Sequence, residues 1–358
     1  MTRKISRQLP LVPLFEKFIK ASASGRRVTP SGKRLSKGAI VQYRCIFSLL
    51  QEFERTQWSR PIRIKLIHRS SLRELQSEKL YWQRFFRRFS TWLYNDKGYY
   101  DQYTGSVAKV LRTFFNFLLN EKALPVGNFH KQFVVPPQKI TPIVLEPYQL
   151  SFLINDQEFH QSLPKFLQRT KDIFVFGCTV GLRYGDLMKL KKQDVQYAGN
   201  DVYLLLNTTK TASEVKIPLP SYAADIIQKY HRKAGRFVLP RLSGTNINLQ
   251  LKMVIEKAGW TYSLPKVRYR QGKAVEMKTK NGMSFRFCDH ITAHTMRRTA
   301  ITTLLMLGVE ETMVRRISGH EPGSKEFYKY VAVVQDYLND KVKFAHKKLI
   351  EINAKNAA

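Results

Sequence analysis

Apolar residues recur at spacings of three and four in three long segments of the first third of the chain. The segments begin at Ser36, at residue 72 and at residue 104. This spacing gathers apolar side chains on one face of a helix. The apolar positions are Ile40, Tyr43, Phe47, Leu50 and Phe53, then Leu80, Phe85, Phe89 and Trp92, then Val107, Val110, Leu111, Phe114, Phe117 and Leu118. We therefore predict a small all-helical bundle of about 90–100 residues, an ordinary domain size.

A proline-rich stretch interrupts the helical pattern at residues 134–147. It carries four prolines, and Pro136-Pro137 favours extended backbone. A new helical region opens at Tyr148, so we place an interdomain linker here. The predicted divisions are an N-terminal extension over 1–35 with a short helix around Leu14–Ile19, a helical domain over 36–133, the linker over 134–147, a second domain over 148–335 and a C-terminal helix or tail over 336–358.

Alternating, β-branched sequence appears in two places in the second domain. Residues 202–220 predict two strands joined by a turn at Ala212-Ser213. Residues 266–287 form a second hairpin-like piece, with turn signals at Gln271-Gly272 and Asn281-Gly282. Helical patterns precede and follow these pieces. The predicted fold class is therefore mainly α with a small antiparallel β-sheet (α+β).

The amino-acid composition indicates the kind of molecule that the protein binds. The chain has 358 residues, of which 43% are hydrophobic, and a net charge of +34. Residues 1–140 hold 27 Lys and Arg against 8 Asp and Glu, and the remainder holds 34 against 19. Because both halves are basic, we expect both to contact one long polyanion. Charge alone also allows an RNA-binding factor or a ribosome-type protein that coats nucleic acid.

The cysteine content and the hydropathy pattern indicate the cellular compartment of the protein. Cys45, Cys178 and Cys288 are too few and too scattered for a disulfide framework or a CxxC metal site. No apolar run approaches the roughly 20 residues that a membrane span needs. The N-terminus has no adequate apolar signal region. We expect a cytoplasmic protein with reduced, mostly buried thiols and no membrane partner.

Residues 291–330 concentrate the side chains needed for attack on a phosphodiester. His294 and Arg297 lie three apart in a helical segment and so share a face. His320 follows a glycine, and Tyr328 and Tyr330 come shortly after it. Singly, each of these residues has an ordinary structural explanation: a solvated arginine, a hydrogen-bonded histidine, a core tyrosine.

Two further segments supply cations. Arg183, in TVGLRYGDLMKL, comes shortly after a glycine at a predicted helix start, where its guanidinium and the helix N–H groups can face an anion. Lys210 lies near the tip of the first hairpin. Either residue alone would be interpreted as a surface cation.

Taken together, and in this order along the chain, these segments resemble the signature of the tyrosine recombinase (phage integrase) family. The matching positions are Arg183, Lys210, His294-x-x-Arg297, Gly319-His320 and Tyr330. The flanking segments GLRYGDL, TTKT and AHTMRRT are also similar to those of the family. The resemblance runs from about Ser36 to Val334, and the wording is most similar to integrases of bacterial mobile elements. The helical domain over 36–133 resembles that family's core-binding domain.

The resemblance implies a site-specific DNA recombinase that cleaves and rejoins DNA through a covalent 3′-phosphotyrosine, in integration or excision of a mobile element. It implies that Arg183 and Arg297 hold the phosphate by forked hydrogen bonds, with His320 as a third donor. His294 would bind the phosphate or help to take the tyrosine proton. Lys210 would protonate the 5′-oxygen that leaves. Clustered cations can neutralise the transition state, so no metal and no other cofactor is expected.

The nucleophile requires a choice. The family usually places it about nine residues after the last histidine, whereas Tyr328 and Tyr330 stand at +8 and +10. Phe327, Tyr330, Val331 and Val334 form one helical stripe that we expect to face inward, and Tyr328 points roughly opposite. We predict Tyr330 as the nucleophile, with Tyr328 in reserve. Asp186 is predicted to orient the site without touching phosphate, and a first-turn helix acid is the alternative.

The expected partner is double-stranded DNA. Candidate phosphate contacts are Arg84, Arg87, Arg88, Lys109 and Arg112 in the helical domain and Lys266, Arg268 and Arg270 in the second hairpin. A solvated basic face is the alternative for the helical domain. The resemblance implies a dimer on inverted half-sites, a tetramer in synapsis, and a nucleoid-associated bacterial protein. Its C-terminal helix would pack on a neighbouring protomer, although packing in cis fits as well. Competing functions are type IB topoisomerase-like relaxation and non-catalytic DNA binding on the same fold.

Overall fold

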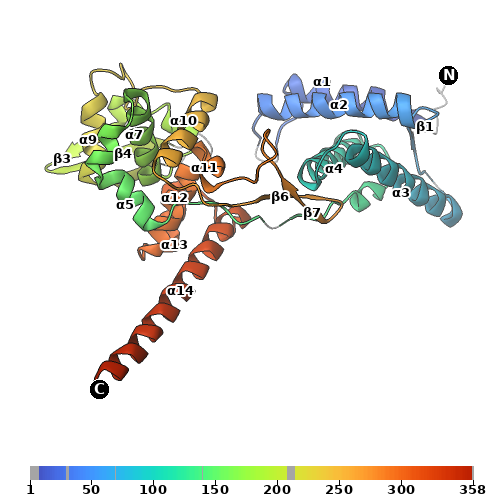
Figure 1. Ribbon diagram of the computed structural model, residues 1–358. Helices are drawn as coiled ribbons and strands as arrows, with labels where there is room; N and C mark the ends of the chain where they lie inside the picture. The colour runs from blue at the N-terminus through green and yellow to red at the C-terminus, as the bar shows by residue number, and fades with distance from the viewer. Residues whose placement is uncertain (1–7, 30–31, 69, 139, 208–213, 357–358) are drawn as a thin grey trace. The chain divides into compact units, whose positions relative to one another are not determined.

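The structure, a computed structural model, describes residues 8–29, 32–68, 70–138, 140–207 and 214–356. The chain divides into two compact units (Figure 1). Unit 1 comprises Met1–Lys139 and Val267–Met277, and unit 2 comprises Ile140–Lys266 and Lys278–Ala358. Helices dominate both units, and the sheets are small, which confirms the predicted fold class.

Unit 1 is a helical bundle with two short two-stranded sheets, β1-β2 and β6-β7. Its elements are β1 (Gln8–Pro10), α1 (Leu11–Ala23), α2 (Lys37–Gln57), β2 (Arg63–Lys65), α3 (Leu72–Asn95), α4 (Asp101–Asn116), a π-helical turn (Phe117–Glu121), a 3₁₀ turn (Phe129–Gln132), β6 (Lys266–Arg270) and β7 (Lys273–Met277). Ser36 caps α2 by accepting from the Ala39 N–H, and Ser71 forms a capping box with Glu74 at α3.

The core of unit 1 is built from aromatic rings on the predicted helix faces. Phe114 of α4 lies 4.9 Å from Phe15 and 5.7 Å from Phe18 between ring centroids, and all three are fully buried. On α3, Phe85 and Phe89 are buried as predicted, whereas Leu80 is 50% exposed. Leu80 lies between the buried residues Glu78 and Trp82, and its spacing of five from Phe85 places it off the buried face of the helix.

The N-terminal segment belongs to this core, which departs from the extension predicted for residues 1–35. Leu11, Phe15 and Phe18 lie at i, i+4 and i+7 along α1 and are fully buried. The short helix expected at Leu14–Ile19 is thus one part of a longer element. The basic stretch that follows α1 in the sequence gives no sign that this helix packs against α2.

The β6–β7 hairpin also belongs to unit 1, although it was predicted within the 148–335 domain. Its two-residue turn has Gln271 at φ +52° and Gly272 at φ +76°, as a primed hairpin turn requires. The carboxylate of Asp101, buried in the first turn of α4, accepts from the N–H groups of both turn residues at 2.8 and 2.9 Å. Arg270 donates to the Gly98 carbonyl at 2.9 Å. The chain thus passes between the units at 139/140, inside the predicted linker, and again on each side of the hairpin.

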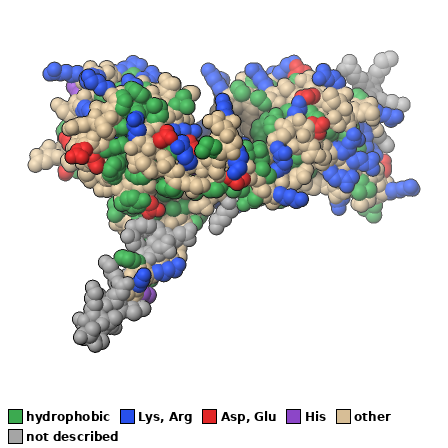
Figure 2. All heavy atoms as spheres, viewed as in Figure 1, with side chains coloured by type: hydrophobic (Ala, Val, Ile, Leu, Met, Phe, Trp, Pro, Cys, Tyr) green, Lys and Arg blue, Asp and Glu red, His purple; other side chains and the backbone are tan. Residues whose placement is uncertain are grey.

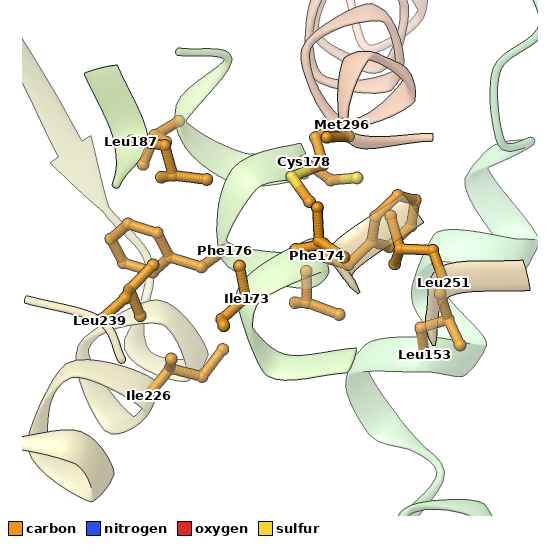
Figure 3. Packing of buried hydrophobic residues seen from close by; sticks show 14 of the residues in the cluster. Leu153, Ile173, Phe174, Phe176, Cys178, Leu187, Ile226, Leu239, Leu251 and Met296 are labelled. Carbon is orange, nitrogen blue, oxygen red and sulfur yellow. The ribbon is translucent and has the colours of Figure 1, made fainter. Parts of the chain in front are cut away.

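Unit 2 surrounds one central helix, α7. Its elements are α5 (Pro147–Asn155), α6 (Gln157–Ser162), α7 (Lys165–Val180), α8 (Tyr184–Leu187), a 3₁₀ turn (Lys192–Asp194), β3 (Val195–Ala198), β4 (Asp201–Asn207), β5 (Glu214–Leu219), α9 (Ser221–Tyr230), α10 (Gly244–Lys257), α11 (Phe287–His290), α12 (Ala293–Met306), α13 (Glu311–Ser318) and α14 (Lys325–Asn356). Figure 3 shows Phe174 and Cys178 of α7 packed with Met296 of α12 and Leu251 of α10.

The sheet of unit 2 has the order β3-β4-β5 and is antiparallel throughout. Leu204 of β4 pairs with Ile217 of β5, and both side chains are buried in the core. The two strands predicted over 202–220 are confirmed. The turn expected at Ala212-Ser213 lies outside the described residues. Strand β3 was not predicted, because its four residues are mostly exposed and carry no apolar alternation.

Helix α14 runs without interruption from Lys325 to Asn356, so the described part of the predicted tail, residues 336–356, continues the helix that carries the two candidate tyrosines (Figure 1). Its first turns pack on α12, with Phe327, Tyr330 and Val334 buried. Farther along, Leu338, Val342 and Phe344 are exposed.

Close contact between α7 and α12 depends on Gly177. A Cβ added there would lie 2.5 Å from Met296 Sδ and 3.1 Å from Met296 Cβ, whereas a Cβ at Gly185 would meet no atom within 4 Å. Gly→Ala raises helix propensity at both sites. We therefore expect Gly177→Ala to be less stable than Gly185→Ala by on the order of 1–3 kcal/mol from overpacking. Urea unfolding of both variants measures this difference, and equal stabilities would refute the close packing.

Candidate active site

The first part of the site is the junction of α7 and α8. Gly181 ends α7 in the left-handed region at φ +64°, a conformation that glycine adopts without strain. The turn places Arg183 as the N-cap residue immediately before α8, at the helix start predicted from the sequence. That helix is a single turn, and the Asp186 and Leu187 N–H groups bond to the Arg183 carbonyl. The guanidinium of Arg183, rather than a helix dipole, is therefore the group available to an anion here.

The second part is the start of α12, where Thr292 and Thr295 form a capping box. Arg297 is only 3% exposed. Its Nη1 donates to the Gly181 carbonyl at 3.0 Å, and its Nη2 donates to the Ser318 carbonyl at 2.5 Å. The guanidinium thus fastens α12 to the ends of α7 and α13. Its partners in these two bonds are neutral carbonyls, so the bonds themselves supply no counter-charge.

The third part is the end of α13. Gly319 is left-handed at φ +59°, its N–H bonds to the Arg316 carbonyl, and the His320 N–H bonds to the Arg315 carbonyl. This pair of bonds is a Schellman motif, which requires a residue such as glycine before His320. Arg297 Nη2 lies 3.2 Å from His320 Nε2 and 3.4 Å from Nδ1. The sequence motif Gly319-His320 therefore directs the imidazole to the buried arginine.

The fourth part is the first half of α14. Tyr330 is 6% exposed, and its ring centroid lies 5.9 Å from that of His320. Tyr328 is 53% exposed, and the Arg315 guanidinium lies 5.1 Å from its ring centroid. The predicted inward stripe is confirmed, because Phe327 and Val334 are buried and Val331 packs against the same cluster. Of the two tyrosines, Tyr330 adjoins the arginine and histidine.

Electrostatic effects connect these four parts. Burial, followed by the charge of Arg183, lowers the pKa of Arg297 to about 10, while Tyr330 and Asp186 act in the opposite direction. For His294, desolvation is the largest cause of a lowered pKa, followed by the charges of Arg298, Arg297 and Arg183. Taken as a whole residue, His294 is exposed. Arg297 stays charged at neutral pH beside a second arginine, an arrangement that an incoming anion would relieve.

The predicted residues outside this cluster fall into three groups. Lys210 lies outside the described residues. Arg84 and Arg87 are exposed on α3, and Lys109 and Arg112 line a groove of about 300 Å³ beside α4. The others already have contacts within the protein. Arg88 donates to the Gln57 carbonyl, Lys266 lies over Phe285, and Arg268 and Arg270 lie over Tyr100.

Two residues that hold the site were not predicted. The carbonyls of Gly181 and Ser318 orient Arg297. In the sequence, these two residues are marked only by their positions next to the Leu182-Arg183 and Gly319-His320 motifs. Among the described residues, no group of three or more His, Cys, Asp or Glu side chains could hold a metal ion. Within those same ranges, no helix is long and apolar enough to traverse a lipid bilayer.

Comparison with known proteins gives consistent results. The model of the phage integrase family matches residues 157–335. Tyrosine recombinase XerC of Bacillus licheniformis is 25% identical over 246 residues, which cover 66% of this chain and 73% of that protein.

Two solved structures share the fold. The XerH site-specific recombinase bound to palindromic difH substrate, a post-cleavage complex, has a TM-score of 0.61 and 11% identity, and the match covers 94% of this chain and 96% of that chain. The Tn1549 transposon integrase in complex with circular intermediate DNA has a TM-score of 0.56 and 15% identity, with 90% and 95% covered. The family model spans half of the chain and includes all four parts of the site, so the chain belongs to the phage integrase family of tyrosine recombinases.

Proposed function

We propose that this recombinase cleaves and rejoins double-stranded DNA with Tyr330 as its nucleophile. The observation that carries the proposal is the buried Arg297, which is held by neutral carbonyls, lies next to His320 and couples electrostatically to Arg183 and Tyr330. A phosphodiester is an anion whose forked recognition by arginine is strong and directional. Its charge would compensate the two guanidinium groups beside the tyrosine hydroxyl.

The chemistry follows from this arrangement. The Tyr330 oxygen forms a bond to phosphorus as the bond to the 5′-oxygen breaks, which leaves a 3′-phosphotyrosine and a 5′-hydroxyl. Arg183, Arg297 and His320 donate to the non-bridging oxygens, where negative charge grows in the transition state. The tyrosine proton needs an acceptor. His294 suits this role, because its lowered pKa keeps the imidazole neutral at pH 7. We assign Lys210 to protonation of the leaving oxygen.

The DNA contacts of unit 1 follow from exposure. Arg84 and Arg87 on α3 and Lys109 and Arg112 at the α4 groove are the cations that we assign to DNA phosphates. Figure 2 shows Lys and Arg side chains distributed over the visible face of unit 1, with fewer Asp and Glu. Binding through such contacts releases counterions and weakens steeply as salt rises.

Strand exchange sets the number of protomers. Two duplex sites require four strand cuts, and each chain supplies one Tyr330. We therefore assign a dimer to each site, on inverted half-sites, and a tetramer to the synapsis of two sites. The exposed apolar residues Leu338, Val342 and Phe344 of α14 support packing on a neighbouring protomer. The Tn1549 transposon integrase shares the fold, and it supports a role in the movement of a mobile element.

A plasmid assay separates this function from its competitors. The protein is incubated with a supercoiled plasmid that carries two copies of the DNA flanking its own gene. Recombination predicts new restriction fragments from exchanged arms, which require both copies. Relaxation of any plasmid regardless of sequence would instead identify type IB topoisomerase activity. Salt-sensitive binding without strand breakage would identify a non-catalytic DNA-binding protein.

A further inference from the structure

Ser318 lies at the end of α13, two residues before His320, and is 3% exposed. Its hydroxyl oxygen lies 2.6 Å from the Val314 carbonyl, 3.3 Å from the Arg315 carbonyl and 2.8 Å from His320 Nδ1. A serine hydroxyl has one proton to donate and two lone pairs that accept. This hydroxyl therefore connects the helix backbone to one nitrogen of the imidazole.

The distances determine which way the protons lie. The shortest contact, to the Val314 carbonyl, takes the hydroxyl proton, because a carbonyl only accepts. The serine oxygen must then accept from His320, so Nδ1 carries a proton. The proton assignment of a histidine is set in this way by the hydrogen bond of its other nitrogen.

Arg297 does not distinguish the two ring nitrogens, since its Nη2 lies 3.4 Å from Nδ1 and 3.2 Å from Nε2. A half-turn of the ring about its χ2 axis would bring carbon Cδ2 to Ser318 and break the serine bond. The hydroxyl of Ser318 is thus the contact that selects one of the two ring orientations. In that orientation Nε2 is the nitrogen left for a phosphate, to which it donates once it also carries a proton.

We propose that Ser318 is a positioning residue of the recombinase active site, which fixes the orientation and the Nδ1-protonated form of His320. The inference rests on the proposed role of His320 as a phosphate donor. A neutral ring protonated at Nδ1 only accepts at Nε2, so donation to the phosphate comes from the imidazolium, which keeps the Nδ1–H bond to Ser318. Ser318 itself touches no reacting atom. Its backbone carbonyl separately holds Arg297, so removal of the hydroxyl alone leaves that bond in place.

The proton assignment is tested directly by ¹⁵N NMR of the full chain labelled at histidine, with His320→Gln to identify the His320 signals. In the wild-type protein we expect Nδ1 to be the protonated nitrogen of neutral His320, and in Ser318→Ala we expect that preference to be lost. A wild-type ring protonated at Nε2, or a preference unchanged in Ser318→Ala, would overturn the proposal. This readout does not depend on whether the protein cleaves DNA.

The catalytic consequence is tested in single-turnover cleavage of nicked duplexes cut from the flanking DNA. We expect Ser318→Ala to cleave about tenfold more slowly, equivalent to about 1.4 kcal/mol, with unchanged DNA affinity. Ser318→Thr retains the hydroxyl and should restore most of the rate. Ser22→Ala is the matched control, because Ser22 is another buried serine that bonds to the carbonyl four residues earlier and lies in α1 of unit 1.

A wild-type rate in Ser318→Ala would overturn the proposal. Equal losses in Ser318→Ala and Ser318→Thr would also overturn it, since they would indicate packing rather than hydrogen bonding. If the wild-type protein cleaves no substrate, the proposed function fails, and the NMR result still decides the role of Ser318.

Discussion

Arg297→Ala is expected to lower the rate of DNA cleavage by about 10²–10³-fold, the scale seen when one donor to a developing oxyanion is removed. Arg297 is the only one of the site's described arginines that is almost fully buried, and water cannot replace it easily. Its loss also leaves the carbonyls of Gly181 and Ser318 without these donors, at roughly 1–3 kcal/mol for each buried group. We therefore expect a lower unfolding free energy as well as a lower rate.

Arg297→Lys separates charge from geometry. Lysine keeps the positive charge, yet its ammonium cannot hold two carbonyls and a phosphate in one plane. We expect its cleavage rate to fall nearly as far as that of the alanine variant. Arg286→Ala is the matched control in unit 2, because Arg286 is paired with Glu256 and Asp289 and lies outside the site. Single-turnover cleavage measures all three variants, and a folded Arg297→Ala protein that cleaves within tenfold of wild type would contradict the assignment.

The sequence was informative where local chemistry determines local structure. The apolar periods predicted α2, α3 and α4, and the Gln271-Gly272 signal predicted the β6–β7 turn. The placement of His320 was also foreseeable, since a glycine that ends a helix in the left-handed region redirects the next residue. The choice of Tyr330 over Tyr328 as the inward residue followed from the helical spacing of Phe327, Tyr330, Val331 and Val334, and the burial of the two tyrosines agrees with it.

These sequence patterns could not predict contacts between segments that lie far apart in the chain. Nothing near Asp101 indicates that its carboxylate binds a hairpin turn 170 residues later in the chain. The burial of α1 depends on rings supplied by α2 and α4, and a short apolar helix has the same pattern whether it docks or not. Ser318 is a further example, because the sequence Ser-Gly-His does not indicate that the serine hydroxyl contacts the imidazole of His320.

Tyr330→Phe is expected to abolish covalent attachment to DNA and leave DNA binding intact. The substitution removes one hydroxyl from a ring that is buried beside His320, so the packing of α14 against α12 should persist. Tyr328→Phe should attach to DNA as well as wild type, because Tyr328 is exposed and points toward Arg315.

The most direct test of the central claim is a covalent-trap experiment. Wild type, Tyr330→Phe and Tyr328→Phe are incubated with nicked duplexes cut from the DNA that flanks the gene, then denatured and separated on a gel. We predict a DNA-linked protein band for wild type and Tyr328→Phe and none for Tyr330→Phe. A band that persists in Tyr330→Phe and disappears in Tyr328→Phe would contradict the account of the active site.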